Sequence, residues 1–204
     1  MIKNIIFDMG GVLIDWAPSH LIEGAGVPEE DAGILLKELF KEVEWLELDA
    51  GTMSDDEVFE AVSRRIPERL HGALRFLISK WWTLPFTYKE GMSELIRELH
   101  DNGYKLYLLS NASAYQKEYF SRLPESECFS GRITSAEINL MKPYAEIYRY
   151  VCDEYNLIPE ECFFVDDYNG NVFFGRKFGF KAYVFFDVDR LRKQMIAEGI
   201  NIKE

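Results

Sequence analysis

The apolar segment Ile5-Ile6-Phe7-Asp8-Met9-Gly10-Gly11-Val12-Leu13 constrains the fold of this chain more than any other segment. A run of β-prone residues that is bounded by Gly-Gly predicts a buried strand. The last residue of this strand is Asp8, which lies at its carboxyl end, where open α/β sheets bind their ligands. A single carboxylate after a strand is more often a turn residue. Asp8 therefore indicates function only if other strands also end in polar residues.

Two later apolar runs do end in polar residues. The strand predicted over 104–109 is followed by Ser110-Asn111, and the strand predicted over 162–165 is followed by Asp166-Asp167. Strands that alternate with helices form parallel sheets, and the carboxyl ends of parallel strands lie at one edge. We therefore expect a hydroxyl, a carboxamide and a carboxylate pair beside Asp8.

A lysine completes the set. Lys142 lies just before Pro143, which suits the first turn of a helix. Each residue has an ordinary explanation when it is taken alone: Ser110 as the end of a strand, Lys142 as a solvated lysine, and Asp166-Asp167 as a helix N-cap pair. Their joint occurrence in this order favours a functional site.

The ordered set Phe7-Asp8-x-Gly-Gly-Val, Ser110-Asn111, Lys142-Pro143 and Asp166-Asp167-x-x-x-Asn171 resembles the four motifs of the haloacid dehalogenase superfamily. Order and spacing match over nearly the whole chain. The opening motif and the compact cap most resemble the α-D-glucose-1-phosphate phosphatase branch. The resemblance implies an α/β fold, in which a Rossmann-like, doubly wound parallel sheet carries a small inserted helical cap of the C1 type.

The pattern between the first two strands changes from short apolar runs to helical periodicity. We therefore expect the core at residues 1–15 and 87–204 and the helical cap at 16–86. In the cap, a helix is expected from a start at Pro28 through Val43, and another over 70–82. Ser54 and Glu57 resemble a capping box. The remaining core elements are expected as helices over 89–101, 113–121, 143–155, 170–178 and 190–204 and as strands near 132–134 and over 181–185.

The acidic residues indicate a metal site. Carboxylates that converge without compensation raise one another's pKa, and a hard divalent cation removes this difficulty. By the resemblance, Asp8, the backbone carbonyl of Gly10 and Asp166 would hold Mg²⁺. Asp167 would assist directly or through water.

The resemblance also implies a mechanism. Asp8 would attack phosphorus and form an aspartyl-phosphate, which water then hydrolyses. Ser110 would donate to a phosphoryl oxygen, and Lys142 would neutralise developing charge. Asn111 would contribute to substrate binding with Ser110 and Lys142, and both Asn111 and Asn171 would mainly position their neighbours.

One position departs from the pattern of the family. Phosphatases of this family usually carry a second Asp two residues after the nucleophile as general acid and base, and here that residue is Gly10. General acid catalysis contributes roughly 10² to 10⁴ in rate. Sugar 1-phosphates need it less, because the anomeric oxygen leaves readily, and the glucose-1-phosphate phosphatase branch also resembles this chain in having Gly there. Asp15 is a conceivable replacement acid, although a solvated loop carboxylate is its ordinary explanation.

Composition excludes several classes of function. The net charge of −12 disfavours nucleic acid binding, which rests on basic patches. No apolar run suits a membrane span and no leader resembles a secretory signal, so a cytoplasmic location is expected. The three cysteines, Cys128, Cys152 and Cys162, lack metal-type spacing and are expected to be reduced.

The sequence thus predicts a Mg²⁺-dependent phosphatase, acting as a monomer on a small phosphorylated metabolite such as a sugar 1-phosphate. Two alternatives remain: a metal-free hydrolase of the dehalogenase type, and a catalytically silent protein of this fold that binds a ligand or a partner. Aromatic residues at helical spacing are mostly core, although one or two could face the pocket as a platform for a sugar. These aromatic residues are Trp45, Trp81, Trp82 and Tyr115.

Overall fold

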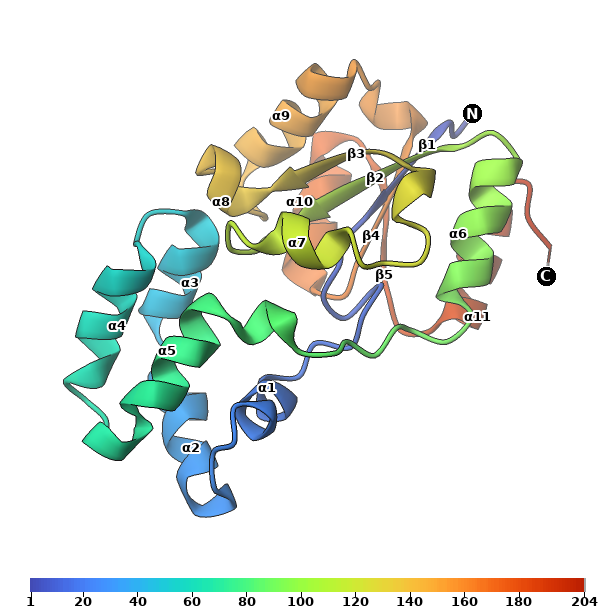
Figure 1. Ribbon diagram of the computed structural model, residues 1–204. Coiled ribbons are helices and arrows are strands. Elements are labelled where there is room, and N and C mark those ends of the chain that lie inside the picture. Colours follow the sequence, from blue (N-terminus) through green and yellow to red (C-terminus); the bar gives the residue numbers. More distant parts are fainter. Residues whose placement is uncertain (204) are drawn as a thin grey trace.

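The computed structural model describes residues 1–203 and contains a five-stranded parallel sheet with helices on both faces (Figure 1). The strands are β1 Asn4–Phe7, β2 Lys105–Ser110, β3 Phe129–Thr134, β4 Cys162–Asp166 and β5 Lys181–Val184. The helices are α1 Pro18–Gly24, α2 Glu29–Glu38, α3 Val43–Ala50, α4 Asp55–Ser63, α5 His71–Ser79, α6 Met92–Asp101, α7 Gln116–Phe120, α8 Ser135–Ile138, α9 Ala145–Tyr155, α10 Asn169–Phe178 and α11 Val188–Ala197. Short 3₁₀ helices are η1 Glu68–Leu70, η2 Trp81–Thr83, η3 Ser126–Cys128 and η4 Pro159–Glu161.

The order of the strands places the ends of β1 and β4 side by side. The sheet runs β3-β2-β1-β4-β5, so the chain builds outward from β1 to β3 and then crosses to β4 on the other side of β1. Phe7 pairs with Leu108 of β2 and with Val165 of β4, and the Asp8 N–H donates to the Val165 carbonyl at 2.9 Å. Ligands bind in such sheets where the direction of winding reverses. The predicted doubly wound α/β sheet is confirmed.

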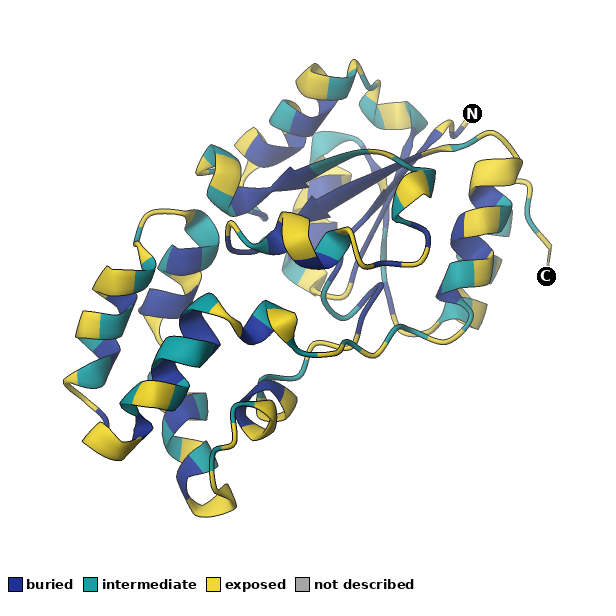
Figure 2. Ribbon diagram, in the orientation of Figure 1, coloured by how far each residue is buried: buried dark blue, intermediate teal, exposed yellow. Residues whose placement is uncertain are grey.

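The two faces of the sheet are covered because side chains alternate along each strand. Ile5 and Phe7 of β1 belong to the hydrophobic cluster that includes buried residues of α6 and α11. Ile6 belongs to a second cluster, which includes residues of α9 and α10. The three central strands β2, β1 and β4 are accordingly buried between the helices (Figure 2). This packing fixes the strand ends that carry the polar residues.

The helices α1 to α5 lie to one side of the sheet, toward the end where α7 and α8 begin (Figure 1). Two neighbouring segments join them to the sheet: Ile14 forms an antiparallel bridge with Tyr88, and the Asp15 N–H donates to the Thr87 carbonyl at 2.8 Å. The hydrophobic cluster of the first sheet face continues into this helical segment and includes Leu35 and Trp81. The segment is therefore packed against the sheet layer as well as tethered to it.

Helix boundaries in this segment differ from the expectation. The helix expected from Pro28 through Val43 is two helices: α2 ends at Glu38, and Val43 begins α3 with a side chain that is 56% exposed. The helix expected over 70–82 ends at Ser79, and α1 was not expected at all. Apolar spacing cannot distinguish one long helix from two short ones that face the same core. By contrast, the capping box at Ser54 is present.

Three further expectations concern membrane spans, the cysteines and the terminal helix. Among residues 1–203, no helix is long and apolar enough to cross a membrane. The cysteines at 128, 152 and 162 are all free thiols, as expected. The terminal helix expected over 190–204 is α11, which begins two residues earlier and ends at Ala197.

Candidate active site

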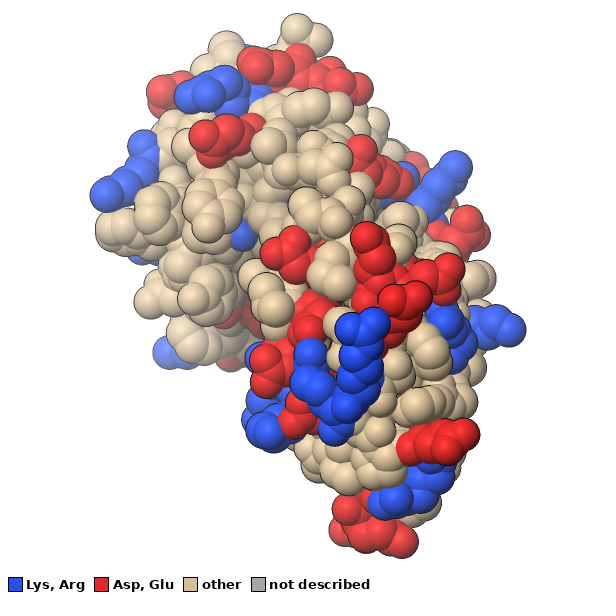
Figure 3. Space-filling model, turned by 90° about the vertical axis from the view of Figure 1, so that its left-hand side faces the viewer, with Lys and Arg blue, Asp and Glu red and all other residues tan. Residues whose placement is uncertain are grey.

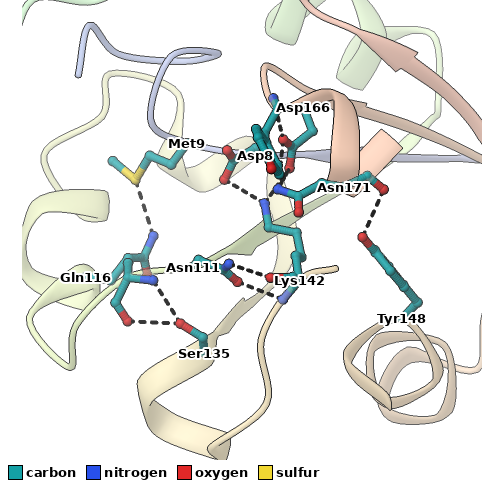
Figure 4. A network of polar contacts seen from close by, with 11 residues as sticks. Asp8, Met9, Asn111, Gln116, Ser135, Lys142, Tyr148, Asp166 and Asn171 are labelled. Atoms are coloured by element: carbon teal, nitrogen blue, oxygen red, sulfur yellow. Dashed lines mark hydrogen bonds and ion pairs between the residues drawn. The ribbon is translucent and has the colours of Figure 1, made fainter. Parts of the chain in front are cut away.

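Lys142 joins the two halves of the site. Its side chain is buried, and its Nζ lies 2.9 Å from Asp8 Oδ1 and 2.6 Å from Asp166 Oδ2 (Figure 4). Asp8 follows β1 and Asp166 ends β4, so the pairing of these strands brings both carboxylates to one lysine. The two carboxylates raise the pKa of Lys142 against the opposing effect of burial. A buried ammonium group is thereby kept charged beside Asp8.

Two carboxamides hold this arrangement (Figure 4). Asn111 accepts from the Lys142 N–H at 2.9 Å and donates to the Lys142 carbonyl at 2.8 Å, so it clamps the backbone that carries the lysine. Asn171 donates to both carboxylate oxygens of Asp166, each at 3.0 Å. Both contacts are those of positioning residues, since each side chain orients a charged neighbour.

Three carboxylates gather beside the lysine. Asp8, Asp166 and Asp167 each have an oxygen that lies within 4.8 Å of the others. Burial is the main cause that raises the pKa of Asp8 to about 7, and burial and Asp166 raise the pKa of Asp167. Lys142 alone therefore does not compensate the negative charge of Asp8 and Asp167. An oxygen-rich set with a deficit of positive charge fits a hard divalent cation such as Mg²⁺.

A glycine makes room for this cluster. Gly11 has φ of +74°, and a Cβ placed there would lie 2.1 Å from Asp167 Oδ2. Only a residue without a side chain allows the turn after β1 to approach Asp167 so closely. The Gly-Gly pair of the first motif thus has a direct steric role in the site.

The acidic cluster opens into a cavity of about 170 Å³. Of the residues expected at the site, Asp8, Gly10, Ser110, Asn111 and Asp167 line this cavity. Ser110 is the last residue of β2 and is buried. Lys142 and Asp166 lie behind this lining and contact Asp8 directly or through each other. The structure thus brings together all seven residues expected at the site.

The helical segment and its linker supply the other wall of the cavity. Trp16, Trp45, Asp49 and Trp81 line it together with Tyr119 of α7. Trp45 and Trp81 belong to the hydrophobic core, as the sequence favoured, and they also line the cavity, which the sequence left open for one or two of the aromatic residues. Trp16, Asp49 and Tyr119 were not expected there. The available signal was the spacing of Trp45 and Asp49, since residues four apart share one face of a helix.

Three residues considered from the sequence lie outside the cavity. Trp82 stacks on Tyr115 with ring centroids 5.8 Å apart, and neither residue lines the cavity. Asp15 forms an ion pair with Lys89 in the paired linkers and does not line the cavity either. Asp15 therefore matches its ordinary explanation as a loop carboxylate.

Comparison with known proteins identifies a matching family model and two phosphatases of similar sequence. A family model described as haloacid dehalogenase-like hydrolase matches residues 2–179. The chain is 27% identical over 192 residues to a D-ribitol-5-phosphate phosphatase of Bacteroides thetaiotaomicron, with 90% of this chain and 91% of the relative covered. It is 28% identical over 171 residues to a sesquiterpene phosphatase of Aspergillus oryzae, with 83% of each covered.

A solved structure has a similar fold. It is a haloacid dehalogenase family enzyme of Bacteroides thetaiotaomicron in complex with magnesium and inorganic phosphate. The TM-score is 0.71 at 21% identity, and the match covers 94% of this chain and 99% of the other. At this identity the likeness concerns the fold.

Proposed function

The chain belongs to the haloacid dehalogenase-like hydrolases, and from this membership we propose that it is a Mg²⁺-dependent phosphatase that forms an aspartyl-phosphate. The observation that carries the proposal is the position of Lys142 between Asp8 and Asp166, beside three carboxylates whose oxygens lie within 4.8 Å of one another. A nucleophile, a fixed cation and a divalent metal site in one small cavity are the parts that phosphoryl transfer requires.

The donors that would hold Mg²⁺ are Asp8, Asp166 and the backbone carbonyl of Gly10, with Asp167 assisting. When bound, the ion neutralises charge on the phosphoryl group and on the carboxylates. The raised pKa values of Asp8 and Asp167 support this assignment, because burial raises them more than the positive charge of Lys142 lowers them. The magnesium and phosphate bound to the solved structure of similar fold agree with it.

The residues of the chain itself perform the remaining steps. Asp8 attacks phosphorus, and the bond from phosphorus to the leaving oxygen breaks. Lys142 stays within 2.9 Å of Asp8 and stabilises the negative charge that develops on the transferred group. Ser110 donates a hydrogen bond to a phosphoryl oxygen. Asn111 contributes by fixing the backbone of Lys142.

The proposed substrate is a small phosphorylated metabolite with a sugar or polyol as its leaving group. The two relatives share the hydrolysis of a phosphate ester. A cavity of about 170 Å³ suits a sugar or polyol phosphate better than a sesquiterpene phosphate. We further propose that residues 16–86 act as a cap over a core formed by 1–15 and 87–204, and that the protein acts as a monomer.

A metal-free dehalogenase is the weaker candidate. Fixed positive charge from Lys142 alone would serve such an enzyme, and the additional carboxylate of Asp167 would only repel an anionic substrate. The cluster of Asp8, Asp166 and Asp167 has a purpose when a divalent cation binds.

Phosphate release tests this function. We expect turnover of p-nitrophenyl phosphate, of D-ribitol 5-phosphate, and of D-glucose 1- and 6-phosphate, and we expect EDTA to abolish it and Mg²⁺ to restore it. Asp8→Asn should remove turnover, because an amide cannot act as the nucleophile. The matched control is Asp15→Asn, which makes the same change outside the cavity and should retain activity within a few-fold. A faster rate with the 1-phosphate than with the 6-phosphate would support a sugar 1-phosphate as substrate.

Two results would overturn the proposal. Turnover that persists in EDTA would exclude the metal role. Absence of turnover above the Asp8→Asn background on all these phosphates would favour the silent binding protein.

A further inference from the structure

The reaction proposed above needs a proton donor that the motif after β1 does not contain. Position 10 has no side chain, and the space beside it is occupied, since a Cβ at Gly10 would lie 3.4 Å from Cβ of Trp16. Sugar and polyol phosphates with ordinary hydroxyl leaving groups release an alkoxide unless an acid protonates it. Another group that faces the cavity must therefore supply this proton if such substrates are hydrolysed.

One carboxyl group remains after the others have been assigned. Among residues 1–203, three carboxyl residues line the cavity: Asp8, Asp49 and Asp167. Asp8 is the proposed nucleophile, and Asp167 belongs to the acidic cluster. Asp15 lies outside the cavity, paired with Lys89. Asp49 is the remaining acid that can contact a bound substrate.

The position of Asp49 is fixed on both sides. It lies in the last turn of α3, and its backbone carbonyl accepts a hydrogen bond from the hydroxyl of Ser135, which begins α8. Its carboxyl group receives hydrogen bonds from the Ser113 backbone and the Trp45 side chain. Ser113 follows Ser110 by three residues, so this contact places the carboxyl group beside the turn that leaves β2.

Tyr119 relates Asp49 to the nucleophile. Its side chain is buried and lines the same cavity, and both Asp49 and Asp8 contribute to raising its pKa. Asp49 and Asp8 therefore both lie near Tyr119, and all three residues line the same small cavity. A small substrate bound in this cavity can therefore contact both carboxyl groups.

The protonation state also suits an acid. Burial raises the pKa of Asp49 to about 8, against the opposing effect of its two hydrogen bonds. A carboxyl group with this pKa carries its proton at neutral pH, which is the state required before the leaving group departs.

We propose that Asp49, supplied by helix α3 of the helical segment, is the general acid and base that position 10 lacks; this inference rests on the proposed phosphatase function. As Asp8 attacks phosphorus, the bond to the leaving oxygen breaks, and its electron pair takes the proton of Asp49. Water then attacks the aspartyl-phosphate and gives a proton to the Asp49 carboxylate. The bond between phosphorus and Asp8 breaks, and its electrons return to the Asp8 carboxylate, so both residues regain their starting state.

The test compares leaving groups in Asp49→Asn. The value of kcat/KM reports the transfer to Asp8, so it is measured for p-nitrophenyl phosphate, for D-ribitol 5-phosphate and for propyl phosphate, which has no free hydroxyl. We expect a loss of about 10² to 10⁴ for both alkyl phosphates and a change of only a few-fold for p-nitrophenyl phosphate, whose leaving group needs no proton. The matched control is Glu42→Gln at the exposed start of the same helix, which should change none of the three.

Two other patterns of loss would exclude Asp49 as the general acid and base. A loss for ribitol phosphate without a loss for propyl phosphate would make Asp49 a ligand of a substrate hydroxyl instead. An equal loss for all three substrates would make it structural. Asparagine resembles the protonated acid in shape, and circular dichroism will show whether the variant is folded. If the wild-type protein itself hydrolyses none of these phosphates with Mg²⁺, the proposed function fails, whereas wild-type turnover with any excluded pattern overturns only the role of Asp49.

Discussion

Two ionisable residues of the site, Lys142 and Asp49, are stabilised in opposite ways. Lys142 has two carboxylate partners within 2.9 Å, so its charged form is favoured despite complete burial. Asp49 has only hydrogen bonds from Ser113 and Trp45, and burial raises its pKa to about 8. A buried ion without an opposite charge becomes neutral instead of remaining ionised. The site thus combines a permanent cation behind the lining of the cavity with a carboxyl group in the lining that keeps its proton.

This difference predicts how stability depends on pH at Asp49. Its pKa of about 8 in the folded state exceeds the reference value of 3.8, so from about pH 4 to pH 8 the unfolded chain releases a proton that the folded chain retains. Rising pH therefore favours unfolding of the wild type over this window. The free energy of unfolding of Asp49→Asn, measured in urea and EDTA, should increase relative to the wild type from pH 5 to pH 8.

Asp31 provides the control with the opposite sign. Its ion pair with Arg69 lowers its pKa, so its stabilising effect is already complete above the unfolded pKa and is lost only in more acid solution. The difference in the free energy of unfolding between Asp31→Asn and the wild type should therefore stay constant from pH 5 to pH 8. A constant difference for Asp49→Asn as well would mean that Asp49 ionises normally in the folded protein.

At the scale of elements, the end of α3 is fixed against α8. The carbonyls of Ala50 and Gly51 accept hydrogen bonds from the Asn139 side chain at 3.1 and 3.0 Å. Gly51 has φ of +70°, and a Cβ there would lie 2.4 Å from the Ala136 carbonyl oxygen. This contact between the helical segment and the sheet layer determines where the last turn of α3, and with it Asp49, lies.

Alanine substitutions at two glycines measure how much the contact between α3 and α8 contributes to stability. Gly26 has a similar φ of +73° but nothing within 4 Å of its Cβ position. Gly26→Ala should cost only the left-handed strain, about 1 to 2 kcal/mol. Gly51→Ala carries the same strain and a clash with backbone, so the free energy of unfolding in urea should fall by at least ~1 kcal/mol more. Equal losses in the two variants would show that α3 can move away from α8 without cost.

The elements also show what the sequence could predict. Strand ends were predictable because short apolar runs bounded by turn residues specify strands locally, and parallel pairing then brings Asp8, Ser110 and Asp166 to one edge. The helical segment was less predictable because its helices are short and share one apolar face, so the break between α2 and α3 left no local signal. Asp49 lies in an acidic helix, where its spacing from Trp45 is the one local signal that sets it apart from neighbours such as Glu47, and tertiary packing is needed to show that it faces a cavity.

At the scale of the whole molecule, the charge distribution determines how a phosphate is attracted. The packing determines how far the effect of ligand binding extends. The net charge is −12, and on the face shown in Figure 3 basic side chains are interspersed with acidic ones. A phosphate must therefore be attracted locally, by Lys142, by backbone N–H groups and by a bound cation. One hydrophobic cluster extends from Leu35 through Trp81 to Phe7, so the helical segment and the sheet share a core. Binding at the acidic cluster should consequently stabilise the whole molecule.

Mg²⁺ should raise the melting temperature, and the size of the rise should depend on pH. A ligand that binds only the folded state stabilises it by about 2.7 kcal/mol at a concentration 100-fold above its Kd. Protons compete with the ion at Asp8, whose pKa is about 7, and at Asp167, whose pKa is also raised. The shift, measured by differential scanning calorimetry at constant ionic strength, should thus be larger at pH 8 than at pH 6 and absent in Asp166→Asn. Because Asp166→Asn removes a ligand without adding bulk, a shift that persisted in that variant would place the ion elsewhere on this acidic protein.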